Sequence, residues 1–264
     1  MRGFTLVFFC WLVASSVFGQ SLIRVPQNDS LQGAINRITN GGTIEVSAGT
    51  YTAPGGAFRM RFLGKGFTVR GVGGEVVLDG GGFTDILRIA DSAPVREIVL
   101  ENLTFRNGYS NTETYSGGVS VDHARVVFRA CRFKSNVAEP STTGGGALRV
   151  SGGADVEIAG SELRGNRSTN RGGAVAALFS RLEVSSSLFT ANTVAIEPNS
   201  GSSAGGGLYV LDSTVTVESS RFEGRAIKRR GAFRRADPAG WPGCTRRRAF
   251  IEFRRQYRRR HSRQ

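Results

Sequence analysis

One spaced motif recurs seven times between residues 44 and 222. Each copy has an aliphatic residue and, two positions later, an aliphatic residue or phenylalanine. A mostly small residue follows after three positions, and an aromatic residue or leucine after two more. These internal offsets never change, whereas the distance between copies varies from 22 to 33 residues. The copies span Ile44–Tyr51, Val76–Phe83, Ile98–Phe105, Val126–Phe133, Val156–Leu163, Leu182–Phe189 and Val215–Phe222. Fixed local geometry with variable connections is typical of a solenoid, whose coils bury their apolar faces against one another.

The first two positions of the motif are two residues apart, so their side chains lie on one face of a β-strand. Stacking the copies predicts one interior column at the second position: Val46, Leu78, Leu100, Phe128, Ile158, Val184 and Val217. In the later copies an asparagine follows the aromatic position after three residues, at Asn136, Asn166 and Asn192, and paired glycines alternate with it. Asparagine tolerates left-handed backbone and bonds across turns, while glycine permits positive φ and close approach of coils.

With these features, residues 23–224 resemble the right-handed parallel β-helices of the pectate-lyase-like superfamily. The FxxN and GGA motifs resemble the repeats of polymorphic outer membrane proteins. The stretch SLQGAINRITNGGTIEVSAGTY is similar to the first coil of the superfamily, which begins with a short helix. Helical spacing, with Asp29 or Ser30 as the cap, is found at Leu31, Ala34, Ile35 and Ile38. The predicted fold is all-β, a right-handed parallel β-helix of about seven coils with a capping helix over its first edge.

The N-terminus has the plan of a secretory signal peptide, which we assign to residues 1–19. Arg2 precedes an apolar run from Phe4 to Val13, and small residues follow up to Gly19. The alternative is an uncleaved membrane anchor, for which the run is short. We therefore predict a secreted or cell-surface protein, associated with an outer membrane and peripheral to it at most. Residues 20–224 form the predicted β-helix, and its one cysteine, Cys131, excludes a disulfide within it.

The composition changes abruptly at Arg225, where the motif calls for asparagine. Residues 225–264 hold 15 of the 35 Lys and Arg residues and 2 of the 21 acidic ones, so they carry nearly all of the net charge of +14. We interpret them as a frame-shifted or truncated end of low order, with a genuine basic tail as the alternative. A polyanionic partner is accordingly an inference about the tail alone, and no specific nucleic acid is expected.

Candidate catalytic side chains do not converge in the predicted register, so we predict no catalytic residue, metal site or cofactor. Glu157 and Glu183 stack on adjacent coils, which we interpret as a surface pair. Asp79 is the most enzyme-like acid, and its alternative role is to form a turn before the glycines that follow. His123 is expected in a solvated loop, and Cys131 in an inward slot.

Two features favour recognition. An outward apolar ladder on three consecutive coils is predicted at Val77, Val99 and Val127. The connection RNGYSNTETYSGG adds Tyr109 and Tyr115 among small polar residues, a composition suited to adaptable contacts. These five residues are the predicted binding site. The alternative is that the connection folds over the valines as a structural cover.

We therefore expect an exported interaction module, an adhesin-like passenger that is truncated, whose partner is a host or cell-surface protein or a glycan. Parallel β-helices also serve as enzymes, because the fold alone does not determine function. The alternative is thus a carbohydrate-active enzyme of the polysaccharide lyase or hydrolase type. A third class, a polyanion-binding protein, would act through residues 225–264.

Overall fold

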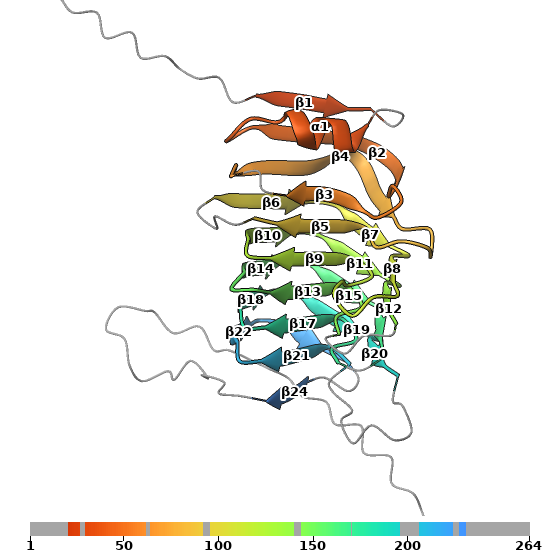
Figure 1. Cartoon of the computed structure of the whole chain (residues 1–264), viewed down its shortest axis with the longest axis vertical. Helices are drawn as coiled ribbons and strands as arrows, with labels where there is room; N and C mark the ends of the chain where they lie inside the picture. The colour runs from red at the N-terminus through yellow and green to blue at the C-terminus, as the bar shows by residue number, and fades with distance from the viewer. Residues whose placement is uncertain are drawn as a thin grey trace, which may run out of the picture.

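The computed structural model describes residues 21–26, 30–61, 64–91, 96–139, 144–169, 171–195 and 206–223, and the backbone of 227–230. Its described strands stack as successive coils of one column, with the single described helix at the N-terminal end (Figure 1). Strands of consecutive coils pair in parallel throughout. The predicted fold class is thus confirmed: the chain forms a parallel β-helix.

Each coil contributes strands to three faces. The first face contains β1 (Leu22–Val25), β2 (Thr43–Thr52), β4 (Phe67–Asp79), β6 (Glu97–Glu101), β10 (Arg125–Arg129), β14 (Asp155–Ala159), β18 (Arg181–Ser185) and β22 (Thr214–Glu218). The second contains the C-terminal halves of β2 and β4, then β7 (Thr104–Arg106), β11 (Arg132–Lys134), β15 (Glu162–Arg164), β19 (Leu188–Thr190) and β23 (Arg221–Phe222). The third contains β3 (Phe58–Arg61), β5 (Leu87–Ala90), β9 (Val119–Asp122), β13 (Leu148–Ser151), β17 (Val175–Leu178), β21 (Leu208–Leu211) and β24 (Ile227–Arg230).

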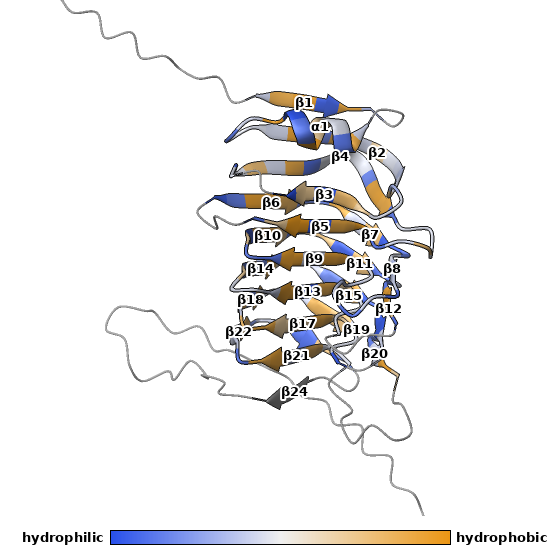
Figure 2. Cartoon of the chain, viewed as in Figure 1, coloured by the Kyte–Doolittle hydropathy of each residue, from blue (hydrophilic) through white to orange (hydrophobic). Residues whose placement is uncertain are grey.

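A short fourth sheet lies between the second and third faces in the later coils. Its strands are β8 (Tyr109–Ser110), β12 (Val137–Ala138), β16 (Arg167–Ser168) and β20 (Thr193–Val194). Among the third-face strands, β5, β9, β13, β17 and β21 are drawn mainly in the colours of hydrophobic residues in Figure 2, and every residue of β17 is buried.

The interior column is confirmed from the third coil onward. Phe128 pairs with both Leu100 and Ile158, and Val184 joins Ile158 to Val217. The aromatic positions form a second interior column on the second face, where Phe105 stacks on Phe133 with ring centroids 4.9 Å apart, and Phe189 on Phe222 at 4.3 Å.

The second copy of the motif is misplaced. Leu78 pairs with Tyr51 on the second face, and the first-face partner of Leu100 is Val69. Phe83, expected in an inward aromatic position, is 90% exposed. The reason is that β4 is one long strand that runs through both faces, so its aliphatic pair belongs to the second face. The regular solenoid therefore has about five turns, preceded by two irregular coils, instead of seven equal ones.

The corners of the coils use left-handed backbone, but not at the predicted asparagines, because the positive φ lies one residue earlier, at Ser135, Gly165 and Ala191. One corner column has positive φ at Asn102, Ala130, Gly160, Ser186 and Ser219. At another corner the predicted asparagines are buried. The backbone and side-chain nitrogens of Asn136 both donate to Oδ1 of Asn166. The backbone and side-chain nitrogens of Asn166 in turn donate to Oδ1 of Asn192. These amides satisfy buried polar groups of consecutive coils, which stabilises the turn.

Helix α1 (Leu31–Arg37) covers the first edge, as predicted. Ser30 caps it by accepting a hydrogen bond from the Gly33 amide, and Leu31, Ala34 and Ile35 are buried. The Gln32 side chain accepts from the Arg59 amide and donates to the Arg59 carbonyl, as a neighbouring strand would. The open edge of β3 is thereby blocked against pairing with another chain. The other candidate cap, Asp29, lies outside the described residues.

Both predicted terminal segments lie mainly outside the described residues. This holds for the signal peptide and for most of residues 225–264. The backbone of β24 is described, and it pairs in parallel with β21, one strand beyond the break in the sequence motif. Within the part of the chain that the structure describes, no helix is long and apolar enough to cross a membrane.

Candidate functional site

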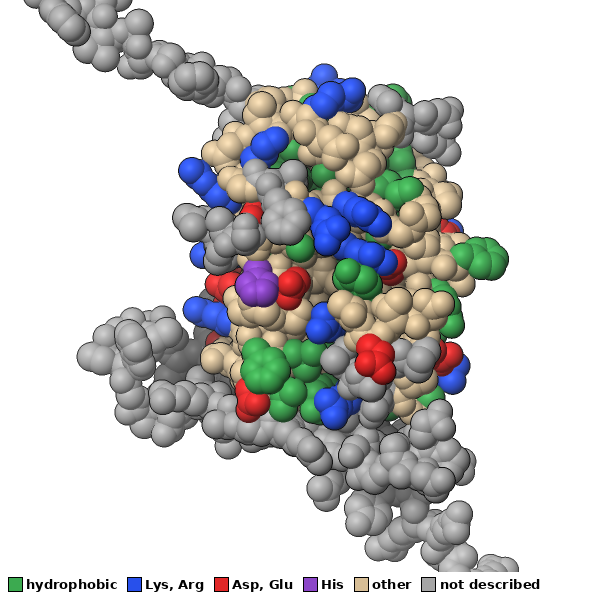
Figure 3. Space-filling model, in the orientation of Figure 1, with side chains coloured by type: hydrophobic (Ala, Val, Ile, Leu, Met, Phe, Trp, Pro, Cys, Tyr) green, Lys and Arg blue, Asp and Glu red, His purple; other side chains and the backbone are tan. Residues whose placement is uncertain are grey.

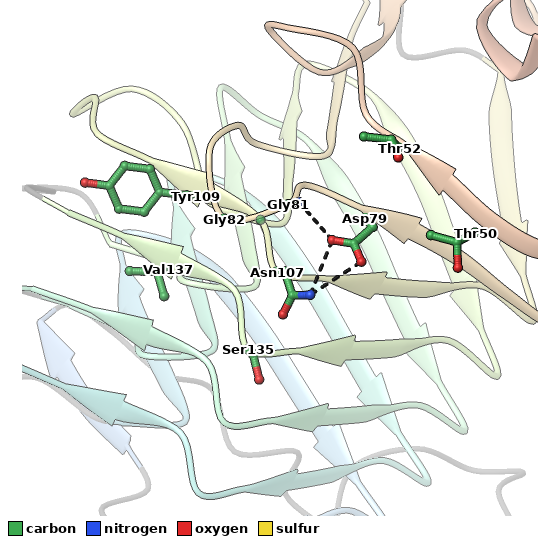
Figure 4. A pocket seen from close by; sticks show the side chains of 10 residues that line it. Thr50, Thr52, Asp79, Gly81, Gly82, Asn107, Tyr109, Ser135 and Val137 are labelled. Carbon is green, nitrogen blue, oxygen red and sulfur yellow. Dashed lines mark hydrogen bonds between the residues drawn. The ribbon is translucent and has the colours of Figure 1, made fainter.

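An open groove of about 490 Å³ lies where the second face meets the short fourth sheet (Figure 4). Four consecutive coils contribute its lining: Thr50, Thr52, Asp79, Gly81, Gly82, Asn107, Gly108, Tyr109, Ser135 and Val137. Because these segments are fixed by the parallel pairing of β2, β4, β7 and β11, the groove exists before any ligand binds.

Among the side chains that line the groove, that of Asp79 takes part in the most hydrogen bonds. Its Oδ2 accepts hydrogen bonds from Nε and Nη2 of Arg106, at 3.0 and 2.6 Å. Its Oδ1 accepts from the Gly81 amide at 2.8 Å, and Nδ2 of Asn107 lies 3.3 and 3.4 Å from the two oxygens (Figure 4). Asp79 therefore forms the turn, the alternative weighed from the sequence, and at the same time lines the groove.

These contacts set the ionisation of Asp79. Burial alone would raise its pKa, but the hydrogen bonds from Arg106, Gly81 and Asn107 outweigh burial and lower the pKa below its usual value. Asp79 is consequently a stable anion at neutral pH. Such a group is poorly suited to act as a general acid, which needs a raised pKa.

Four hydroxyl groups of the groove are available to a ligand. Thr50, Thr52 and Ser135 are exposed, and Tyr109 is partly exposed. Among the described residues, the side chains of these four have no hydrogen-bond partner. A column of basic residues continues beside the groove, because Arg106, Lys134 and Arg164 pair across β7, β11 and β15.

The predicted site residues are not all brought together. Tyr109 lies in the groove, with Val137 next to it in the fourth sheet. Tyr115 lies against the third face, where the Arg88 guanidinium sits 3.7 Å from its ring centroid. Arg149 donates to the carbonyl of Thr114 at 2.6 Å. Two arginines thus hold the segment around Tyr115 on the third face.

The predicted ladder of three valines is wrong in register. Val99 and Val127 do pair on the first face, but the next position is Thr68. Val77 pairs with Thr50 and Thr104 on the second face, because the second motif copy was misplaced there. Val77 and Val127 are also buried, at 5% and 4% exposure. The segment around Tyr115 lies on the third face. It therefore does not cover Val99 and Val127 on the first face or Val77 on the second.

The other residues singled out in the sequence do not form a catalytic arrangement in the described part of the chain. Glu157 and Glu183 are stacked, as predicted, and Glu183 pairs with Arg181. His123 is exposed and hydrogen-bonded to Asp122, and burial raises the pKa of the Cys131 thiol to about 12. In the described ranges, no group of three His, Cys, Asp or Glu side chains is placed to bind a metal ion.

The third face carries a second feature that the sequence did not indicate. Arg59, Arg88 and Arg149 lie in one outward column with Ser120 between the last two. Figure 3 shows Lys and Arg side chains gathered over this part of the surface. Towards the C-terminal coils the column becomes apolar, at Ala176 and Tyr209.

No protein-family model matches the chain, and no curated protein is significantly similar to it in sequence. Among solved structures it is similar to the crystal structure of pectate lyase Pel9A, with 12% identity and a TM-score of 0.42, over 77% of this chain and 70% of that chain. The strand pairing by itself establishes that the fold is a parallel β-helix, and the comparison adds no further argument.

Most of the groove could not be found from the sequence. Asp79 and Tyr109 were singled out, but for separate reasons and not as neighbours. Thr50 and Thr52 come from one coil and Ser135 from another, and exposed hydroxyl residues carry no signal individually. Correct alignment of β4 would have been the one usable signal, because it places Asp79 between Thr52 and Arg106.

Proposed function

We propose that the chain is an exported interaction module whose β-helix binds a glycan in this groove. The observation that carries the proposal is the set of unpartnered hydroxyl groups of Thr50, Thr52, Tyr109 and Ser135 around the anionic Asp79. Sugar hydroxyls both donate and accept hydrogen bonds, so hydroxyl and carboxylate groups on a rigid surface are suitable partners. Rigid strands reduce the entropy lost on binding.

Binding fits the groove better than catalysis. Hydrolysis of a glycosidic bond uses two carboxyl groups on either side of it. Asp79 is the one carboxylate among the described lining residues, and its oxygens already accept hydrogen bonds from Arg106 and Gly81. The groove therefore supplies recognition without an evident acid and base.

The enzyme alternative has one observation in its favour. Asp79, which lines the groove, forms an ion pair with Arg106, and lyase chemistry places a base beside a cation. Incubation with polygalacturonate and xylan, followed by measurement of released products, separates the two functions. Product release that disappears in Asp79→Ala would establish the enzyme and reject the binding module.

The binding proposal is tested on an oligosaccharide array with the full mature chain. Thr50→Val and Thr52→Val together remove two hydroxyls while keeping the shape of the groove. We expect affinity for the bound oligosaccharides to fall about thirtyfold, because the two hydrogen bonds removed contribute about 1 kcal/mol each. Thr214→Val, an exposed threonine on the first face, is the matched control and should change nothing. Equal losses in both variants, or no binding at all, would reject the proposal.

The proposed location is the cell surface or the extracellular space, with a cell-surface glycan as the partner. The signal-peptide pattern of residues 1–19 and the adhesin-like repeat motifs support it. N-terminal sequencing of the exported protein tests it, with Gln20 as the expected first residue. Retention of Met1 with the chain in the cytoplasm would contradict the proposed location.

A further inference from the structure

Phe83 is the most exposed large hydrophobic side chain among the described residues, at 90%. Single exposed apolar residues are common and need no functional explanation. Phe83 differs because its backbone belongs to a turn that several hydrogen bonds fix at the rim of the groove.

That turn shares its supports with the groove. The Gly81 amide donates to Asp79, and the Gly82 amide donates to the Asn107 carbonyl at 2.7 Å. The amides of Phe83 and Thr84 both donate to the Gly80 carbonyl, at 3.1 and 3.2 Å. The turn that presents Phe83 is therefore held by hydrogen bonds to Asp79 and Asn107, which both line the groove.

Two glycines bring the aromatic ring and the groove together. Gly81 and Gly82 both line the groove and have φ of 62° and 78°, which glycine adopts without strain. Cδ2 of Phe83 lies 3.5 Å from the position that a Cβ on Gly81 would occupy. The ring thus lies beside Gly81, which is a residue of the groove wall.

We propose that Phe83 is a stacking platform for a pyranose ring of the glycan, an inference that rests on the proposed function of the groove. The C–H groups on one face of a pyranose pack against the negative face of an aromatic ring, while the hydroxyls at the edge of the sugar remain free. Asp79 and Asn107 line the same groove, where such hydroxyls can reach them. The expected ligand unit is therefore a sugar with a continuous C–H face.

The proposal is tested by titration calorimetry of the full mature chain with cellohexaose, xylohexaose and a galacturonic acid hexamer. Phe83→Ala should weaken binding of the oligosaccharide that wild type binds by about tenfold, whereas Phe83→Trp, which keeps an aromatic face, should retain it. Phe179→Ala is the matched control, since Phe179 is 61% exposed at a corner after β17. The added tryptophan should also change its fluorescence on binding.

Each outcome decides something. If Phe83→Ala binds as wild type does while the double threonine variant is weakened, Phe83 is not the platform and the proposed function stands. If wild type binds none of the three oligosaccharides and none on the array, the glycan function is rejected and the role of Phe83 with it. Because Phe83 is exposed, its variants should keep the wild-type melting temperature, which separates lost binding from lost folding.

Discussion

At the scale of single residues, the buried asparagines show how the solenoid specifies its turns. Asn166 is fully buried, and its side chain both accepts from Asn136 and donates to the Phe133 carbonyl and to Asn192. A smaller residue there would remove the acceptor of both Asn136 nitrogens, the donor to the Phe133 carbonyl and one of the two donors to Oδ1 of Asn192. Buried polar groups without partners are costly, so this position has little tolerance.

We expect Asn166→Ala to lower the free energy of unfolding by about 3 to 5 kcal/mol, because it leaves several buried groups unsatisfied. Urea unfolding followed by circular dichroism measures this. Asn111→Ala, in the exposed part of the connection, is the control and should stay within about 0.5 kcal/mol of wild type. Similar losses for both variants would show that the asparagine ladder contributes little.

Asp79 should make stability depend on pH. Its pKa is lowered in the folded chain, because hydrogen bonds from Arg106, Gly81 and Asn107 outweigh the effect of burial. A depressed pKa adds stability above the unfolded value, and that stability is lost as pH falls through the folded value. Asp79→Asn should therefore be less stable than wild type at pH 7, and the difference should shrink as pH falls below 3.8 towards 2.

Urea unfolding at several pH values measures this difference. The exposed Asp212, which has no ion pair among the described residues, gives the control variant Asp212→Asn. A difference between Asp79→Asn and wild type that stays constant with pH would mean that the carboxylate charge of Asp79 does not stabilise the fold.

At the scale of strands and turns, interior columns should govern stability and connections should not. Phe128→Ala and Ile158→Ala should each cost about 2 to 5 kcal/mol, since both side chains are fully buried and leave a cavity. Phe83→Ala should cost almost nothing, although the sequence motif alone gives it the same importance. Thermal unfolding of the three variants is the measurement, and a large loss for Phe83→Ala would contradict the placement of β4.

The two tyrosines of one connection should separate in function. Tyr109→Ser should weaken oligosaccharide binding with little effect on melting temperature, because Tyr109 lines the groove. Tyr115→Ser should lower stability by about 1 kcal/mol and leave binding intact, because it removes the contact with Arg88. Melting curves and array binding of both variants test this, and the reverse assignment would contradict the structure.

The sequence predicts the spacing of residues within one coil better than the strand register between neighbouring coils. Val126 to Phe133 and Val156 to Leu163 have the predicted partners, because each coil there repeats with separate short strands. The predicted register is wrong at Val76 to Phe83. One long strand there runs through two faces, and its aliphatic pair has the spacing of the motif but lies on the second face. The groove depends on that coil, so the misplacement of β4 also concealed the proximity of Asp79 and Arg106.

At the scale of the whole molecule, the parallel β-helix is a rigid column that brings distant segments together at one surface. Strands of neighbouring coils lie about 4.8 Å apart, so a groove across four coils spans roughly 15 Å, the length of a few sugar units. Residues 50–52, 79–82, 107–109 and 135–137 meet there although the chain separates them by up to 87 positions. No single segment could provide such a site.

Hydrogen–deuterium exchange by mass spectrometry, with and without an oligosaccharide selected on the array, tests this account most directly. Bound glycan should slow exchange in peptides covering residues 50–52, 79–83, 107–109 and 135–137, and leave the first-face strands β14 and β18 unchanged. Protection confined to the third face, around Arg88 and Arg149, or spread evenly over all faces, would contradict a binding groove on the second face.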